Sequence, residues 1–160
     1  MNADIRLNKN HLVQTLQKPS SEFTKDDIIR YIEAERIEMV NFMYPAGDGR
    51  LKTLNFVIND LRYLDTILSF GERVDGSSLF EHIDPANSDL YVIPRFTTAF
   101  RDPFAEIPTV TMLCTFFDKD GRPLANSPEQ ILRKACEELT KVTSLEFNAM
   151  AELEFYVIDP

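Results

Sequence analysis

The stretch that decides the fold is residues 37–58, IEMVNFMYPAGDGRLKTLNFVI. Its two ends, 37–44 and 51–58, are rich in apolar, β-branched and aromatic residues, and apolar residues alternate from Leu54 onward. Such alternation is typical of a strand with one buried face. Between the two ends lies the turn cluster Pro-Ala-Gly-Asp-Gly at 45–49. Two strand patterns joined by a short loop of this composition predict a β-hairpin.

Helix signals flank the hairpin on both sides. Thr24 with Asp27 at the third helical position forms a capping-box pattern ahead of an isoleucine-rich run, which predicts a helix to about Arg36. After the hairpin, Asp60 caps a second run of apolar residues at helical spacing, and Gly71 ends it. Along the chain, the hairpin is therefore expected to lie between two helices.

The remaining segments alternate between strand and helix patterns. Residues 1–23 are polar without a clear period and predict a loosely held arm, whereas 72–108 predict short strands and an extended loop. A strand is expected over 109–117 and a long strand over 145–159. Between these two strands, Ser127 followed by a proline and by Gln130 predicts a capped helix. The stripe that this helix is expected to bury comprises Ile131, Leu132, Ala135, Cys136 and Leu139. This order of elements predicts an α+β fold with a mixed sheet.

Composition excludes several classes of function. The 160 residues carry 26 acidic and 17 Lys or Arg side chains, a net charge of -9, so general binding to nucleic acid is not expected. No stretch approaches the ~18 apolar residues of a membrane span. Residues 1–17 lack the apolar core of a signal peptide, so we expect a cytoplasmic location and no membrane. The two cysteines, Cys114 and Cys136, suggest no disulfide framework and no zinc site.

Two acidic residues near the end of the chain are candidate metal ligands. Glu152 and Glu154 alternate in a predicted strand, so they share a face with their backbones about 6.6 Å apart. Paired carboxylates suit a hard divalent ion such as Mg²⁺ or Mn²⁺. The commoner alternative is the solvated face of an exposed strand.

A second candidate is the tetrapeptide Asp75-Gly76-Ser77-Ser78. These residues favour a tight turn, because aspartate and serine side chains bond nearby backbone groups and glycine accepts unusual dihedral angles. The simpler interpretation is an Asx-turn alone. The functional interpretation is a carboxylate and a hydroxyl displayed on a loop where they can bind a small cation.

Five ordered motifs are spread over residues 36–160. They are Gly49-Arg50 with Lys52, Val74-Asp75-Gly76-Ser77-Ser78, Ser88-Asp89-Leu90 with Pro94, Cys114 with Asp120-Gly121 and Ser127-Pro128, and Ala151-Glu152-Leu153-Glu154-Phe155 with Asp159. In this order and rough spacing they resemble the N-terminal part of type I glutamine synthetases. Two departures are Val74, where that family has phenylalanine, and Glu129, where it has arginine.

The resemblance implies a domain organisation and a reaction. An arm at 1–23 would precede a β-grasp domain at 24–122, and 123–160 would be the truncated start of the family's α/β catalytic domain. Members of the family join glutamate and ammonia with ATP as co-substrate, through a γ-glutamyl phosphate. Glu152 and Glu154 would be ligands of the active-site Mg²⁺ or Mn²⁺, while the ATP pocket lies outside this chain.

The resemblance also assigns catalytic roles. Asp75 would bind ammonium and accept its proton, with Ser78 as a weaker contributor at the same site. In the family the active site lies between subunits of a double-ring homo-oligomer, a dodecamer. Since the family's remaining metal ligands and its ATP pocket lie beyond Pro160, this chain alone is expected to be inactive. Two alternatives stay open: a non-catalytic, truncated β-grasp docking module, and a γ-glutamyl–amine ligase of the same superfamily. A carboxylate at position 75 favours ammonium over a bulky amine.

Overall fold

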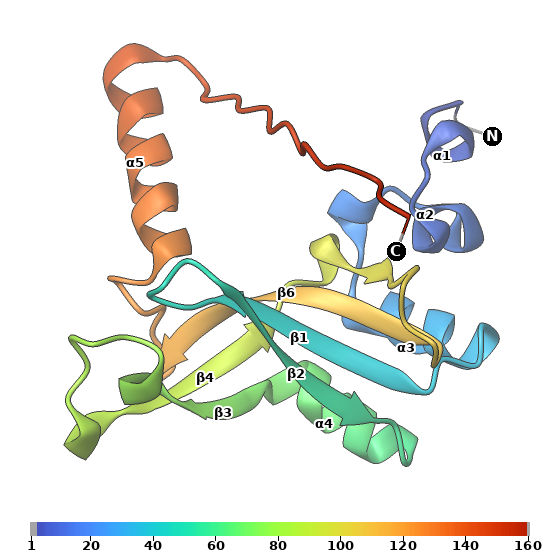
Figure 1. Ribbon diagram of the computed structural model, residues 1–160, viewed down its shortest axis with the longest axis horizontal. Helices are drawn as coiled ribbons and strands as arrows, with labels where there is room; N and C mark the ends of the chain where they lie inside the picture. Colours follow the sequence, from blue (N-terminus) through green and yellow to red (C-terminus); the bar gives the residue numbers. More distant parts are fainter. Residues whose placement is uncertain (1–2, 160) are drawn as a thin grey trace.

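The computed structural model describes residues 3–159 and is built around a six-stranded mixed sheet (Figure 1). The strands are β1 (Met39–Pro45), β2 (Leu51–Val57), β3 (Glu72–Asp75), β4 (Asp89–Pro94), β5 (Phe100–Arg101) and β6 (Thr109–Asp118). Their spatial order is β2-β1-β6-β4-β3, and β5 also pairs with β6. The β1–β6 pair is parallel and the other pairs are antiparallel, which confirms the expected α+β class with a mixed sheet.

The predicted hairpin is confirmed as the pair β1–β2. Pro45 lies opposite Leu51, so the connecting loop is Ala46–Arg50, one residue later than the turn cluster suggested. The Ala46 N–H donates to the Arg50 carbonyl at 2.9 Å and closes the loop. Gly49 has φ +78°, a left-handed conformation that favours glycine and accounts for the residue there.

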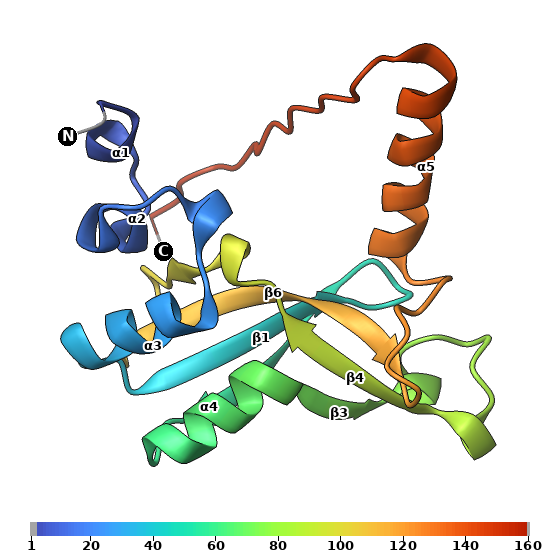
Figure 2. The same ribbon diagram turned by 180° about the vertical axis from the view of Figure 1, so that it is seen from behind.

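Both predicted flanking helices are present and cover the same face of the sheet (Figure 2). In α3 (Lys25–Ala34), Thr24 and Asp27 form the capping box in both directions. In α4 (Leu61–Phe70), Asp60 accepts from the Tyr63 N–H at the start, and Gly71 ends the helix with φ +69°. The apolar faces of both helices are buried against the sheet, which builds one core.

The core is centred on β1 and β6. The buried residues of these strands are Val40, Phe42 and Tyr44 from β1, and Val110, Met112, Cys114 and Phe116 from β6. The Phe116 ring packs edge-on against the rings of Tyr44 and Phe80, at centroid distances of 5.4 and 5.1 Å. Burial raises the pKa of the Cys114 thiol, which packs as a small apolar side chain.

The prediction of a loosely held arm before α3 is wrong. The segment contains α1 (Ala3–Leu7), α2 (His11–Leu16) and the 3₁₀ turn η1 (Ser20–Glu22). Leu12 and Val13 of α2 are fully buried, and His11 Nδ1 lies 2.7 Å from the Tyr31 hydroxyl. Two neighbouring apolar residues are enough to attach this short helix to the core, although they give too weak a period to stand out in the sequence.

Two predictions for the C-terminal part are also wrong. The helix α5 (Pro128–Thr143) is present, but Ser127 makes no side-chain cap bond, and Ile131 and Leu132 are 56% and 59% exposed. Residues 145–159 form no strand; they run as an exposed, unpaired chain from α5 back across the molecule (Figure 1). The apolar pattern is there, but no described element covers it. Among the described residues, no helix is long and apolar enough to cross a membrane.

Candidate functional site

The Asp75–Ser78 turn is a fixed structure at the end of β3. It forms the 3₁₀ helix η2 (Gly76–Ser78), and Asp75 Oδ1 accepts hydrogen bonds from the Ser77 N–H at 3.0 Å and the Ser77 hydroxyl at 2.7 Å. Ser78 Oγ donates to the Asp75 carbonyl at 2.8 Å. Hydrogen bonds from the side chains of Ser77 and Ser88 hold the pKa of the exposed Asp75 carboxyl below its usual value. The two interpretations of this tetrapeptide therefore hold together: it is an Asx-turn, and it presents a charged carboxylate to solvent.

Gly76 anchors this turn to the next strand. Its N–H donates to the Ser88 carbonyl at 2.7 Å, just before β4. A side-chain carbon at position 76 would lie 2.8 Å from the Leu90 side chain, closer than carbon atoms can approach. The glycine is thus required by close packing rather than by its backbone angles.

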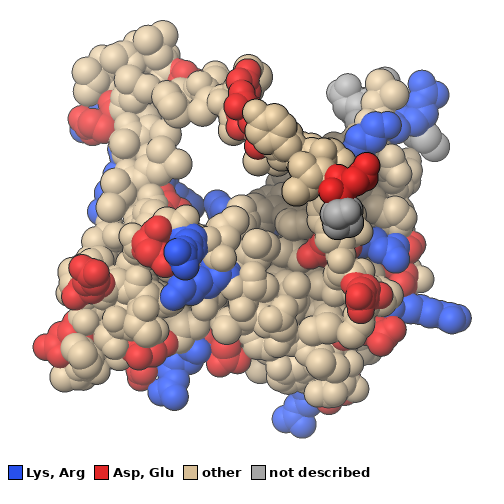
Figure 3. Space-filling view, viewed as in Figure 1, with Lys and Arg blue, Asp and Glu red and all other residues tan. Residues whose placement is uncertain are grey.

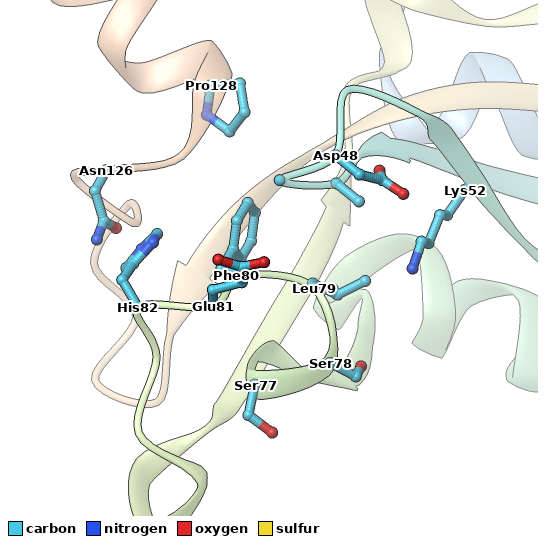
Figure 4. A pocket seen from close by; sticks show the side chains of 12 residues that line it. Asp48, Lys52, Ser77, Ser78, Leu79, Phe80, Glu81, His82, Asn126 and Pro128 are labelled. Atoms are coloured by element: carbon cyan, nitrogen blue, oxygen red, sulfur yellow. The ribbon is translucent and has the colours of Figure 1, made fainter.

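A cleft of about 520 Å³ opens beside the turn (Figure 4). It is lined by Ala46, Gly47, Asp48, Lys52, Ser77, Ser78, Leu79, Phe80, Glu81, His82, Asn126 and Pro128. Asp48 and Lys52, from the hairpin, lie on one side of it, and His82 and Asn126 lie on the other. Three segments that are distant in the sequence thus meet around one hollow.

The cleft offers polar groups of both signs. Within residues 3–159, Lys52, Glu81, His82 and Asn126 make no side-chain hydrogen bond or ion pair with the protein. A cation, an anion, an imidazole and an amide are therefore available to a ligand or to another chain. The sequence singled out Lys52 only as part of a motif, and lone polar residues such as Asn126 have no spacing that would reveal them.

The candidate metal ligands lie elsewhere. Glu152 and Glu154 are exposed in the segment 145–159, which Figure 1 places on a different side of the molecule from β3. Carboxylate oxygens suit Mg²⁺ or Mn²⁺, but no group of three or more His, Cys, Asp or Glu side chains in the described part of the chain is arranged to hold a metal ion. The structure therefore does not bring Asp75 and these two glutamates together.

Comparison with known proteins gives one family. The family model described as "Glutamine synthetase, beta-Grasp domain" matches residues 36–119. The glutamine synthetase of Staphylococcus aureus strain MW2 is 26% identical over 142 residues, which cover 87% of this chain and 31% of that enzyme. The glutamine synthetase of Staphylococcus epidermidis strain ATCC 12228 gives the same identity and coverage. The chain thus spans about a third of the length of the curated relatives it matches.

Solved structures show the same fold. A cryo-EM structure of Plasmodium falciparum glutamine synthetase matches with a TM-score of 0.63 and 19% identity, over 75% of this chain and 23% of that one. GmaS in a complex with ADP matches with a TM-score of 0.61 and 15% identity, over 71% of this chain and 25% of that one. At these identities the structural likeness concerns the fold alone.

Proposed function

Since the chain belongs to the glutamine synthetase family through its beta-Grasp domain, we propose that it is part of an ATP-dependent glutamate–ammonia ligase. In this proposal, the parent enzyme phosphorylates the γ-carboxylate of glutamate, and ammonia then displaces the phosphate to form glutamine. The single observation that carries the proposal is the Asp75 carboxylate, which is exposed, held charged and fixed by its own turn beside a polar cleft.

Asp75 is proposed to act on ammonium. An anionic carboxylate binds the small cation and accepts one of its protons, which leaves neutral ammonia as the nucleophile. The lowered pKa of the Asp75 carboxyl keeps it ionised under ordinary conditions. Ser78, whose hydroxyl bonds to the Asp75 carbonyl, is proposed as a weaker contributor that fixes the turn.

Glu152 and Glu154 are proposed as two ligands of Mg²⁺ or Mn²⁺ in the parent enzyme. A bound divalent ion would offset the negative charge of glutamate and of the ATP phosphates. Among the described residues, no group of three or more possible ligands is arranged to hold a metal ion, so we derive no step through the metal. We further propose cytoplasmic homo-oligomers, a double ring of twelve subunits, in which Asp75 serves the catalytic domain of a neighbour. The chain alone, which holds only two of the expected metal ligands, is proposed to be inactive.

Two alternatives remain testable. A γ-glutamyl–amine ligase would join glutamate to a larger amine. Asp75 argues against this alternative, because a carboxylate at the ammonium site favours a small cation and crowds a bulky amine. A docking module without catalytic function would need no charged carboxylate on the turn. The family membership favours the ligase over the docking module.

The test is Asp75→Asn in the full-length parent enzyme. We expect ammonia-dependent glutamine formation to fall by about 10²–10⁴-fold, the usual contribution of an acid–base group. The matched control is Asp84→Asn, because Asp84 caps the neighbouring 3₁₀ helix η3 (Pro85–Asn87) through the same kind of bond. The turn of Asp75 lines the cleft with Ser77 and Ser78, whereas no residue of the Asp84 turn lines it. Retained activity in Asp75→Asn, or an equal loss in both variants, contradicts the assigned role.

A further inference from the structure

The hairpin loop and the Asp75–Ser78 turn are bonded backbone to backbone. The Gly47 N–H donates to the Leu79 carbonyl at 2.9 Å. In turn, the N–H groups of Leu79 and Phe80 donate to the Gly76 carbonyl at 3.1 and 2.9 Å. A short series of hydrogen bonds thus connects the loop between β1 and β2 with the residue next to Asp75.

This contact is possible only because residue 47 has no side chain. A Cβ at Gly47 would lie 2.9 Å from the Leu79 carbonyl oxygen and 3.3 Å from Phe80 Cδ1. The φ of Gly47 is outside the left-handed region, so its backbone angle does not require glycine. Gly49, two residues on, is the opposite case: its φ is +78°, and nothing lies within 4 Å of a Cβ there.

The turn has little freedom to absorb a displacement at Leu79. Phe80 is buried and packs against the core ring of Phe116, which blocks movement in that direction. At the other end, Gly76 is fixed to the Ser88 carbonyl. A shift of the Leu79 carbonyl would therefore be passed along η2 to the bonds that Ser77 makes with Asp75.

We propose that Gly47 is a positioning residue for Asp75. The hairpin loop sets the place of the carboxylate by direct backbone contact with the turn, and any side chain at position 47 displaces it. This inference rests on the proposed function for its catalytic consequence, but the mechanical coupling between the loop and the turn is a property of the chain itself.

The first experiment compares Gly47→Ala with Gly49→Ala in the 160-residue chain. NMR would follow the Ser77 and Ser78 amides and the titration of the Asp75 carboxyl carbon. In Gly47→Ala we expect the two amide signals to move and the pKa of Asp75 to rise toward its usual value, because the Ser77 bonds weaken. In Gly49→Ala, which strains the hairpin without touching the turn, both should stay as in the original chain. Equal responses in the two variants, or none in Gly47→Ala, overturn the proposal.

A second experiment leaves both glycines intact. Asp75→Ala removes the cap of η2, so the coupling predicts that hydrogen exchange of the Gly47 amide becomes about threefold faster, as expected for one weakened hydrogen bond. The Gly49 amide, which donates to Ala46 within the hairpin loop, serves as the internal control and should not change. Unchanged exchange at Gly47 overturns the proposal, and this result does not depend on whether Gly47→Ala folds.

Kinetics of the parent enzyme separate this inference from the proposed function. Gly47→Ala should raise KM for ammonium about tenfold with a smaller change in KM for ATP, since misplacing a binding group by a fraction of an ångström is costly. An NMR response without this kinetic response, in an enzyme that also tolerates Asp75→Asn, would reject the role of Asp75 and keep the coupling. Loss of the NMR response rejects the coupling, whatever the kinetics of Asp75→Asn show.

Discussion

In β6 the alternating apolar side chains are buried, whereas those of residues 145–159 are exposed. Phe116 is fully buried between two other aromatic rings. Leu153 and Phe155, which alternate in the same way, are 87% and 73% exposed. Figure 3 shows open space between the body and the part of the segment that leaves α5. The same sequence pattern thus has opposite outcomes in two parts of one chain.

Neighbours account for the difference. β6 pairs with β1 on one edge and with β4 and β5 on the other, so its backbone groups are bonded and both of its faces are covered. The segment 145–159 has no paired strand among the described residues. An unpaired strand leaves its N–H and C=O groups to water. Alternating apolar residues therefore mark a segment that can form a strand, but their side chains are buried only where the fold supplies neighbouring elements.

Core truncation should show the largest contrast between the two regions. Phe116→Ala is expected to lower the free energy of unfolding by about 3–5 kcal/mol, because it removes a buried ring and leaves a cavity. Phe155→Ala should change it by less than about 0.5 kcal/mol, since the ring is exposed. Urea unfolding of both variants, followed by circular dichroism, measures these values. Similar losses in both would mean that residues 145–159 pack against the body in solution.

Most of the fold could be predicted from sequence because local signals and tertiary packing agree in the central part of the chain. The capping box of Thr24, the cap at Asp60 and the stop at Gly71 each fix a helix end within a few residues. The order of strands could not be predicted, because the parallel β1–β6 pair depends on contacts far apart in the sequence. The burial of Leu12 was missed for the same reason, since its partners come from other elements.

The candidate site was predictable only in part. The Asx-turn at Asp75 follows from its residue types, and the structure confirms it. The cleft was not predictable, because Lys52 and Asn126 come together only when the hairpin meets the start of α5. The contact at Gly47 also left no signal, since one glycine in a turn cluster is indistinguishable from another until its neighbours are known. The roles proposed for Glu152 and Glu154 remain predictions.

Acid should reveal a smaller difference in stability between the two regions, because a carboxylate in the folded body is buried, whereas those of residues 145–159 are exposed. Asp27 is buried and accepts hydrogen bonds from Lys18, Arg30 and Thr24. Burial alone would raise its pKa, but the bonds from Lys18 and Thr24 outweigh burial and lower it to about 2 from 3.8. Its ionised form therefore stabilises the fold by about 2 kcal/mol above pH ~4, and this contribution is lost as the pH falls toward ~2.

The measurement is the free energy of unfolding from pH 7 to pH 2, in the original chain and in Asp27→Asn. The variant should be less stable at neutral pH, and most of the difference should be lost near pH 2, where the Asp27 carboxyl of the folded original chain is half protonated. Glu154→Gln is the control from the other region, because its exposed side chain makes no described contact. A constant difference between Asp27→Asn and the original chain at every pH would assign its effect to packing instead of charge.

The smallest expected effect concerns the joint between the two regions. β6 pairs with β1 only as far as Leu113. Beyond it, the Phe116 N–H donates to Glu129 Oε1 at 3.1 Å, and the Phe116 carbonyl accepts from the Leu124 N–H at 2.9 Å. Glu129 thus covers an open edge of β6 and fastens the first turn of α5 to the body.

Glu129→Ala should therefore lower the free energy of unfolding by only about 1 kcal/mol, the net contribution of one hydrogen bond. Exchange of the Phe116 amide should accelerate with it, while Glu137→Ala, on an exposed part of the same helix, should alter neither quantity. If Glu129→Ala leaves the Phe116 amide as protected as before, the side chain does not join the two regions. The orientation of α5 would then depend on the backbone hydrogen bonds between residues 122–124 and β6. The same bonds would determine where the exposed apolar stripe of the helix lies.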